Sequence, residues 1–278
     1  MAAGAVPLRS YRAIFAARFM LTLQYRVAAL AGVVTQLWWG IIKVMVFAAF
    51  YHGASHYQPL TFAQTVAYVW LGQAFLMLMP WWGDPEITEM VRSGNVSYER
   101  LRPLDTYFFW YLRGMAWITA RIVPRATMML LFVGWIVPAM GLGKWGLMMP
   151  PNRAAATLFV GAILLAVLLS SAILMLINIL VVVLVTDRGP SLLASQIVTL
   201  LSGILVPLPF FPASMRAVLF FQPFAGLADI PFRIYSGALA GGLAFAGLVQ
   251  MTIWIGLLIA IGHALLGRVM GRLQVQGG

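Results

Sequence analysis

The chain contains no cysteine and very little charge. Only 9% of its 278 residues are Asp, Glu, Lys or Arg, whereas 62% are hydrophobic. Soluble domains carry about 25% charged residues, so a soluble fold of this composition would have to hide more apolar surface than it can cover. The absence of cysteine excludes a disulfide framework and thiol chemistry. Together with a mean hydropathy of +0.93, this composition predicts an all-α polytopic membrane protein.

Several catalytic and energy-coupling signatures are also missing. No G-x-x-x-x-G-K-[ST] loop is present, so the chain cannot hydrolyse ATP by that route. Neither a G-x-S-x-G elbow nor a zinc signature occurs. No carboxylate falls within a predicted span, whereas proton-coupled carriers generally keep an ionisable relay there. We therefore expect no enzyme activity and no metal or cofactor on this chain, and any transport would draw its energy from another subunit.

The charge that is present is mostly basic. Eighteen Lys and Arg residues stand against seven acids, giving a formal charge of +11. In a membrane protein such an excess reports topology and contact with membrane lipids, so we do not interpret it as nucleic-acid binding.

Six apolar segments are long enough to be membrane spans: 27–50, 62–82, 115–142, 154–185, 191–207 and 243–266. The first exceeds a signal-peptide core, so we expect it to remain as a span. With the N-terminus inside, eleven Lys and Arg residues lie on the cytoplasmic side and four outside. The positive-inside rule thus predicts that both termini are cytoplasmic in one transmembrane domain, 1–278.

Two flanking segments are predicted to lie at the membrane interface. Residues 1–26 carry arginines and aromatics without a clear amphipathic face, and we interpret them as an interfacial lead-in helix. The aromatic stretch from Tyr107 to Trp117 is predicted at headgroup level. The helix would then enter the membrane near Arg121, with Pro124 bending it.

The most structured polar element follows the second span. Asp84 is a good N-cap, Pro85 suits the first helical position, and Gly94 suits a left-handed stop. Five of the seven acids lie between positions 84 and 105. Such a compact polar helix and loop, 84–105, predicts a protein contact at the cytoplasmic surface. Its proposed docking residues are Asp84, Pro85, Glu86, Ile87, Glu89, Met90, Val91, Arg92 and Gly94, with an apolar ridge of Ile87, Met90 and Val91. The alternative is that this ridge packs on the chain's own spans.

Residues 203–237 cannot form one continuous helix, because five prolines interrupt them. Such backbone survives at membrane depth only when it is buried in protein or lines a water-filled cavity. We interpret it as a re-entrant outer segment, with an ordinary outer loop as the alternative. The residues expected at its outer gate are Pro207, Pro209, Phe210, Phe211 and Pro212.

Lys43 is the one lysine within a span. Its stem could reach the outer interface, or its charge could face a central path or a partner chain. Trp38 and Trp39, one turn away, could line the same path, although aromatic residues at span centres more often serve packing. Trp38, Trp39 and Lys43 are therefore the candidate path residues.

The layout and two sets of motifs resemble a known family. VRSGNV (91–96) and LRPL (101–104) are similar to the "I-R-[ST]-G-x-[LV] … L-L-R-P-L" stretch of viologen and daunorubicin-type exporter permeases. PLPFFP (207–212), QPF (222–224) and PFRIYSG (231–237) are similar to that subfamily's proline-broken segment. The chain thus resembles the membrane subunit of an ABC transporter with the ABC-type-2 permease fold. It departs from the family at positions 98–100, which are more polar.

The resemblance implies a role for each part. Residues 84–94 would be the coupling helix, between spans two and three, that docks on an ABC ATPase subunit. Two copies of that subunit, which would hold ATP and magnesium, and a second identical or similar permease would complete an exporter in the bacterial inner membrane. The alternatives are a membrane-embedded lipid-modifying enzyme using Asp187 and Arg188, and a stand-alone channel or scaffold.

Overall fold

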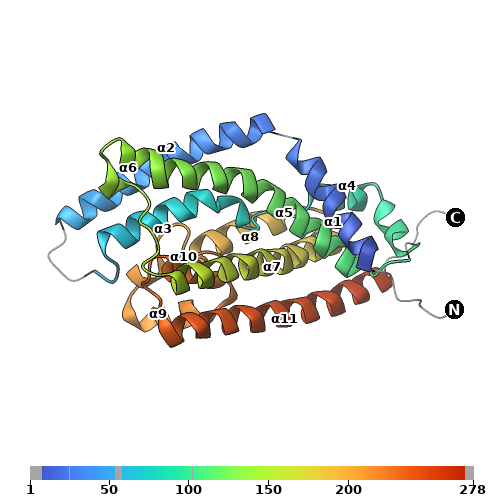
Figure 1. Cartoon of the computed structure of the whole chain (residues 1–278). Helices are drawn as coiled ribbons and strands as arrows, with labels where there is room; N and C mark the ends of the chain where they lie inside the picture. The colour runs from blue at the N-terminus through green and yellow to red at the C-terminus, as the bar shows by residue number, and fades with distance from the viewer. Residues whose placement is uncertain (1–7, 25, 54–57, 102, 273–278) are drawn as a thin grey trace.

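The computed structural model describes residues 8–24, 26–53, 58–101 and 103–272, and within these ranges every regular element is helical. Figure 1 shows the long helices lying roughly side by side. Four helices are long and apolar enough to cross a membrane. They are α2 (Arg26–Gly53), α5 (Thr106–Leu131) continuing through a π-helical turn into α6 (Val137–Ala139), α7 (Arg153–Leu184) and α11 (Gly241–Arg272). The predicted all-α class is confirmed, and these four helices are the candidate spans; the six predicted spans stay a prediction.

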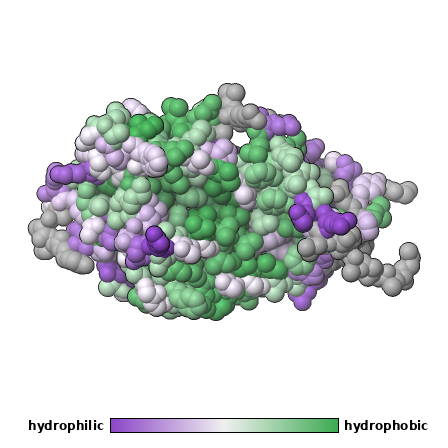
Figure 2. All heavy atoms as spheres, in the orientation of Figure 1, coloured by the Kyte–Doolittle hydropathy of each residue, from purple (hydrophilic) through white to green (hydrophobic). Residues whose placement is uncertain are grey.

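The hydropathy of the surface changes along the length of these helices. Figure 2 shows an apolar band around the middle of the molecule and hydrophilic residues gathered toward its two ends. Helices α1 (Leu8–Leu23) and α4 (Pro85–Arg92) lie at one end, together with the last turns of α11 (Figure 1). Helix α9 (Ala213–Phe221) and α6 lie at the other end. We call these the α4 end and the α9 end.

The predicted span 62–82 is not one helix. A capping box between Thr61 and Gln64 starts α3 (Phe62–Ala74), which is followed by a 3-10 turn, Leu76–Leu78, and then by extended backbone. Pro80 prevents the helix from continuing because proline lacks an N–H group and disfavours helical backbone before it. The carbonyl of Leu78 instead accepts a hydrogen bond from the Ser170 hydroxyl of α7. At thirteen residues, α3 alone is too short to be a spanning helix.

The helix in the region of the predicted span 191–207 also ends earlier than expected. Helix α8 covers Arg188–Leu201, and the chain then turns through Gly203 into a 3-10 turn at Leu208–Phe210. Helix α9, a further 3-10 turn at Pro223–Leu227 and α10 (Asp229–Tyr235) follow, so the proline-rich segment is a series of short helices, as its composition predicts. Pro207, Pro212, Pro223 and Pro231 each stand within one turn of a helix start.

Most aromatic residues at the start of α5 pack within the bundle. Tyr107, Trp110 and Tyr111 are buried, whereas Phe108 is exposed, and their position at headgroup level stays a prediction. The three are buried because α1 packs along α5, while α7 and α11 also contact it. Helix α1 matches the predicted lead-in segment over residues 8–23, whereas residues 1–7 lie outside the described part of the chain.

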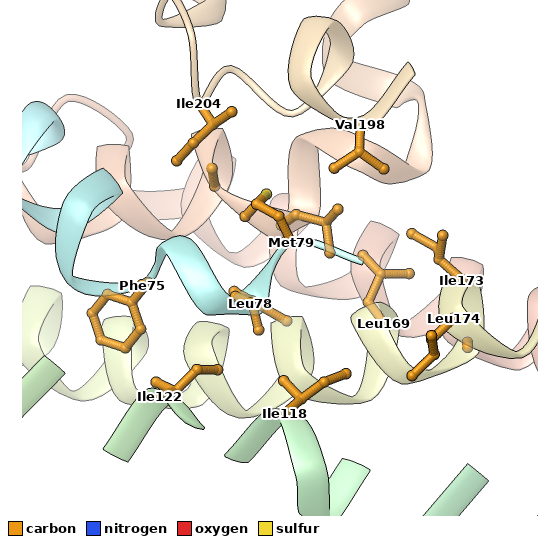
Figure 3. Packing of buried hydrophobic residues seen from close by; sticks show 14 of the residues in the cluster. Phe75, Leu78, Met79, Ile118, Ile122, Leu169, Ile173, Leu174, Val198 and Ile204 are labelled. Carbon is orange, nitrogen blue, oxygen red and sulfur yellow. The ribbon is translucent and has the colours of Figure 1, made fainter. Parts of the chain in front are cut away.

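The core lies where the broken segments meet α5 and α7. Figure 3 shows Phe75 and Leu78 from the α3 region together with Ile118 and Ile122 of α5 and Leu169 of α7. All these side chains are buried. The interrupted backbone after α3 is therefore enclosed by protein, which is the condition under which non-helical backbone is tolerated at membrane depth.

Helices α2 and α3 approach closely at Gly40. A Cβ placed there would come within 2.3 Å of the buried Trp70 ring. We therefore expect Gly40→Ala to destabilise the protein by roughly 1–3 kcal/mol, the usual cost of overpacking. Gly256 of α11 has no neighbour within 4 Å of the same point, so Gly256→Ala should be neutral or slightly stabilising. Thermal unfolding in detergent compares the two variants, and equal melting temperatures would contradict the proposed contact.

Candidate functional site

Helix α4 forms where the capping residues predict it. The carboxylate of Asp84 accepts a hydrogen bond from the Glu86 backbone N–H at 2.9 Å, and Pro85 occupies the first turn. Gly94 follows the helix with a φ of 75°, a left-handed conformation that favours glycine. Eight residues are too few for an isolated helix to be stable in water, so contacts with the rest of the chain must hold it in place.

A polar cluster at the N-terminus of α4 supplies these contacts. We call it the α4 clasp, and it comprises Arg18 of α1, Asp84 and Glu86 of the α4 turn, Arg113 of α5 and Asn178 of α7. Arg113 binds Asp84 through Nε at 3.1 Å and Nη2 at 3.0 Å, and its Nη1 lies 3.4 Å from Glu86. Arg18 pairs with Glu86 and lies 3.9 Å from Asp84.

Asn178 of α7 is the remaining member of the α4 clasp. Its Oδ1 accepts a hydrogen bond from the Asp84 backbone N–H at 2.8 Å. Asp84 is only 1% exposed, and the Arg113 side chain is 10% exposed. Charges this deeply buried interact strongly with their partners and poorly with water. The α4 clasp therefore fixes one end of α4 to three long helices at once.

A second link joins the other end of α4 to the turn between α7 and α8. Arg92 donates to the Asp187 carboxylate at 2.7 Å, and both side chains are largely open to solvent. Through this exposed pair, Asp187 connects the end of α4 to the turn between α7 and α8. The loop beyond α4 is also held in place by side chains. Trp110 donates a hydrogen bond to Glu99 at 3.1 Å. Asp105 caps the start of α5 and also forms a hydrogen bond with His263. Arg102 lies outside the described residues.

The predicted apolar ridge of α4 faces the chain itself. Ile87 is 0% exposed and Val91 is 8% exposed, while Met90 is half-buried. The three therefore do not form a ridge open to a partner, and that part of the docking prediction is corrected. The physical reason is that the apolar stripe of so short an amphipathic helix is what holds it on α7. The outward face instead carries Pro85, Glu86, Glu89, Arg92 and Gly94.

The candidate path residues lie on the outside of this chain. Trp38 is 65% exposed and Trp39 is 55% exposed on α2. Lys43 is partly buried and donates its ammonium group to the backbone carbonyl of Ile204 at 3.1 Å. Lys43 thus binds the carbonyl at the break after α8, a contact that sequence reasoning did not foresee.

The residues predicted for the outer gate pack against the same helix. Phe210 lies near Phe47 and Phe50 of α2, with ring centroids 5.9 and 6.0 Å away. Lys43, Phe47 and Phe50 share one face of α2. That face contacts the broken segment at Ile204, through Lys43, and at Phe210, through the two phenylalanine rings. Among the other gate residues, Pro207 and Pro209 are buried, Phe211 is half-buried and Pro212 is exposed.

Asp229 organises the proline-rich segment. Its carboxylate is fully buried and accepts hydrogen bonds from the Tyr68 hydroxyl, the Leu208 backbone N–H and Arg233, at 3.2, 3.2 and 3.0 Å. In the sequence, the i, i+4 spacing of Asp229 and Arg233 is the feature that could have indicated this ion pair.

These sites are suited to holding elements together. The α4 clasp fixes a surface helix, and Asp229 fixes the proline-rich segment at the α9 end. Neither presents a nucleophile beside a base, which covalent catalysis would require. Comparison with known proteins found no matching family model, curated protein or solved structure.

Proposed function

We propose that this chain is the permease subunit of an ATP-driven exporter in the bacterial inner membrane. The observation that carries the proposal is the attachment of α4, a short amphipathic helix at the polar end of an apolar bundle. Through the α4 clasp and the Arg92–Asp187 pair, α4 contacts α1, α5, α7 and the start of α8. A push on α4 would therefore be delivered to several long helices together, as a coupling helix requires.

In this proposal the membrane is crossed six times. Four crossings are made by α2, α5, α7 and α11. The other two are made by the segment from α3 to α4 and by the segment from α8 to α10, both of which combine short helices with irregular backbone. At the two breaks, the carbonyls of Leu78 and Ile204 find side-chain partners inside the protein, which supports passage of these segments through the apolar band. Both termini would then lie in the cytoplasm at the α4 end.

The proposal also requires a second permease. Trp38 and Trp39 of α2 point away from the rest of the chain, so they can line a path only if another subunit faces them. Two permeases, identical or similar, would enclose the path between them. Two ATPase subunits, which bind ATP and magnesium, would close at the α4 end and rock the halves between inward- and outward-facing states.

The docking surface of α4 provides the test. Glu89 lies on its outward face, whereas Ile87 is buried and Met90 packs partly on the core, so substitutions at those two positions would report on folding instead. The tagged chain is purified from its native membranes in mild detergent, and co-purified ATPase activity is measured after reconstitution. We expect Glu89→Lys to lower that activity by about tenfold or more, because a reversed charge at an interface costs several kcal/mol.

Arg272→Glu is the matched control. Arg272 is an exposed charge on the last turn of α11, away from α4 in the chain but at the same end of the molecule. The control should retain wild-type ATPase activity and subunit composition. If Glu89→Lys also keeps wild-type activity, docking through α4 is wrong. If the purified chain moves solute in liposomes with no ATPase subunit, the exporter proposal fails as a whole.

A further inference from the structure

A pocket at the α9 end combines two guanidinium groups with apolar walls. Its volume is about 500 Å³, and it lies where α9, α10 and the first turn of α11 meet residues 59–60 and 208–209. Arg216, Asp229 and Arg233 are its charged lining residues. The path and docking assignments above use neither the pocket nor Arg216.

The charge in this pocket is unbalanced. Asp229 is already bonded to Arg233, so the second guanidinium, that of Arg216, has no carboxylate within the described chain to offset it. Arg216 uses its Nε to bond the Phe211 carbonyl at 2.8 Å. The Nε of Arg233 is buried and has no hydrogen-bond partner among the described residues. That atom is closed to solvent, so an anion in the pocket would pair instead with the guanidinium groups that line it, above all that of Arg216, which lacks a carboxylate partner.

The remaining walls are hydrophobic. Phe220 of α9, Leu239 and Leu243 line the pocket beside the arginines. Outside it, Val218 and Phe221 of α9 and Phe245 of α11 are exposed, by 72%, 65% and 64%. The pocket thus borders the apolar outer surface at the very start of a spanning helix. This is the depth at which lipid headgroups meet hydrocarbon.

We propose that this pocket binds the phosphate-bearing headgroup of an anionic phospholipid from the leaflet at the α9 end. The phosphate would lie against Arg216 and Arg233, and the glycerol and upper acyl carbons against Phe220 and Leu243. A bound lipid would brace α9 and α10 against α11. The inference depends on α11 crossing the membrane and not on coupling to an ATPase, so the two proposals fail independently.

The test measures lipid binding by the purified full chain in detergent, without nucleotide or partner. Phosphatidylglycerol is titrated, and the rise in melting temperature and the lipid adducts in native mass spectra are recorded. Phosphatidylcholine and soluble glycerol phosphate are run in parallel. We expect phosphatidylglycerol to stabilise the chain at concentrations about tenfold below those needed for phosphatidylcholine, because a net anion gains more from two guanidinium groups.

Two variants connect binding to the pocket. Arg216→Gln should weaken phosphatidylglycerol binding roughly tenfold, the worth of one charge-assisted hydrogen bond. Ala217→Trp should also weaken it, because an indole ring would fill the cavity that Ala217 lines. This substitution leaves the charge of the pocket unchanged. Arg153→Gln is the control, since Arg153 is exposed at the start of α7 and does not line the pocket.

The outcomes separate the alternatives. Loss of binding in Arg216→Gln and Ala217→Trp but not in Arg153→Gln supports the proposal. An equal loss in all three variants would mean diffuse surface charge and would overturn it. If glycerol phosphate stabilises the chain as well as phosphatidylglycerol does, the ligand is a soluble anion and the lipid assignment is wrong. No stabilisation by any of these compounds also overturns it.

Discussion

Replacing Asp84 with alanine is expected to lower the free energy of unfolding by about 3–5 kcal/mol, because it leaves buried arginines without their carboxylate. Arg113 makes two contacts of 3.0–3.1 Å with Asp84, and both side chains are shielded from water. Loss of the N-cap adds to this, by about 1 kcal/mol. Glu86 remains near Arg113 and Arg18 but is half exposed, so it can replace only part of the lost interaction.

Thermal unfolding followed by tryptophan fluorescence measures this change. A loss of that size should lower the melting temperature of Asp84→Ala by roughly 6–15 °C. Asp84→Asn should lie between this variant and the wild type, since asparagine caps helices well but carries no charge. Asp187→Ala is the control, because its exposed pair with Arg92 is worth about 0–1 kcal/mol. If Asp187→Ala were as damaging as Asp84→Ala, burial of the α4 clasp would not be what stabilises α4.

The start and end of α4 could be predicted because their signals are local. Asp84, Pro85 and Gly94 act on backbone groups within one turn, so each residue carries its own prediction. The long apolar helices could be predicted for a similar reason, since about 20 consecutive apolar residues leave few alternatives. In both cases the deciding interactions involve residues that are close in sequence.

The orientation of α4 and the breaks in the short helices could not be predicted in this way. An amphipathic pattern shows that Ile87 and Val91 share a face, but it does not show whether that face meets α7 or a partner. Likewise, the apolar run from 62 to 82 hides a break whose carbonyl at Leu78 is satisfied by Ser170, far along the chain. Lys43 bonds Ile204, 161 residues away. These features depend on tertiary partners that one segment does not specify.

The two polar sites share one construction principle. At each end of the molecule, a buried carboxylate binds one guanidinium group and one backbone N–H group, and one of these two partners comes from another element: Arg113 of α5 for Asp84, and the Leu208 N–H for Asp229. A membrane protein gains little from apolar contact between helices, because lipid is as apolar as the side chains. Specific polar connections are therefore well suited to fixing short helices on a long-helix bundle. Asp84 does so for α4, and Asp229 does so for the proline-rich segment.

Asp229→Ala should consequently be the most damaging substitution at the α9 end. It would leave Arg233 without its counter-ion and would remove the acceptor of both the Tyr68 hydroxyl and the Leu208 N–H. Removing one member of a buried ion pair costs about 3–5 kcal/mol, and each orphaned donor adds about 1–3 kcal/mol, although the losses overlap. We expect a total loss of at least about 4 kcal/mol, concentrated in residues 203–237.

Limited proteolysis and thermal unfolding together locate this effect. Asp229→Ala should be cleaved first within 203–237, whereas α7 and α11 should stay protected because they pack against each other. Asp229→Asn should cost less, since its amide oxygen can still accept from Leu208. Tyr68→Phe removes only one hydrogen bond and should cost about 1 kcal/mol. If Asp229→Ala were no more harmful than Tyr68→Phe, the carboxylate would contribute one contact among many, and the proline-rich segment would be held in place chiefly by its packing on α2.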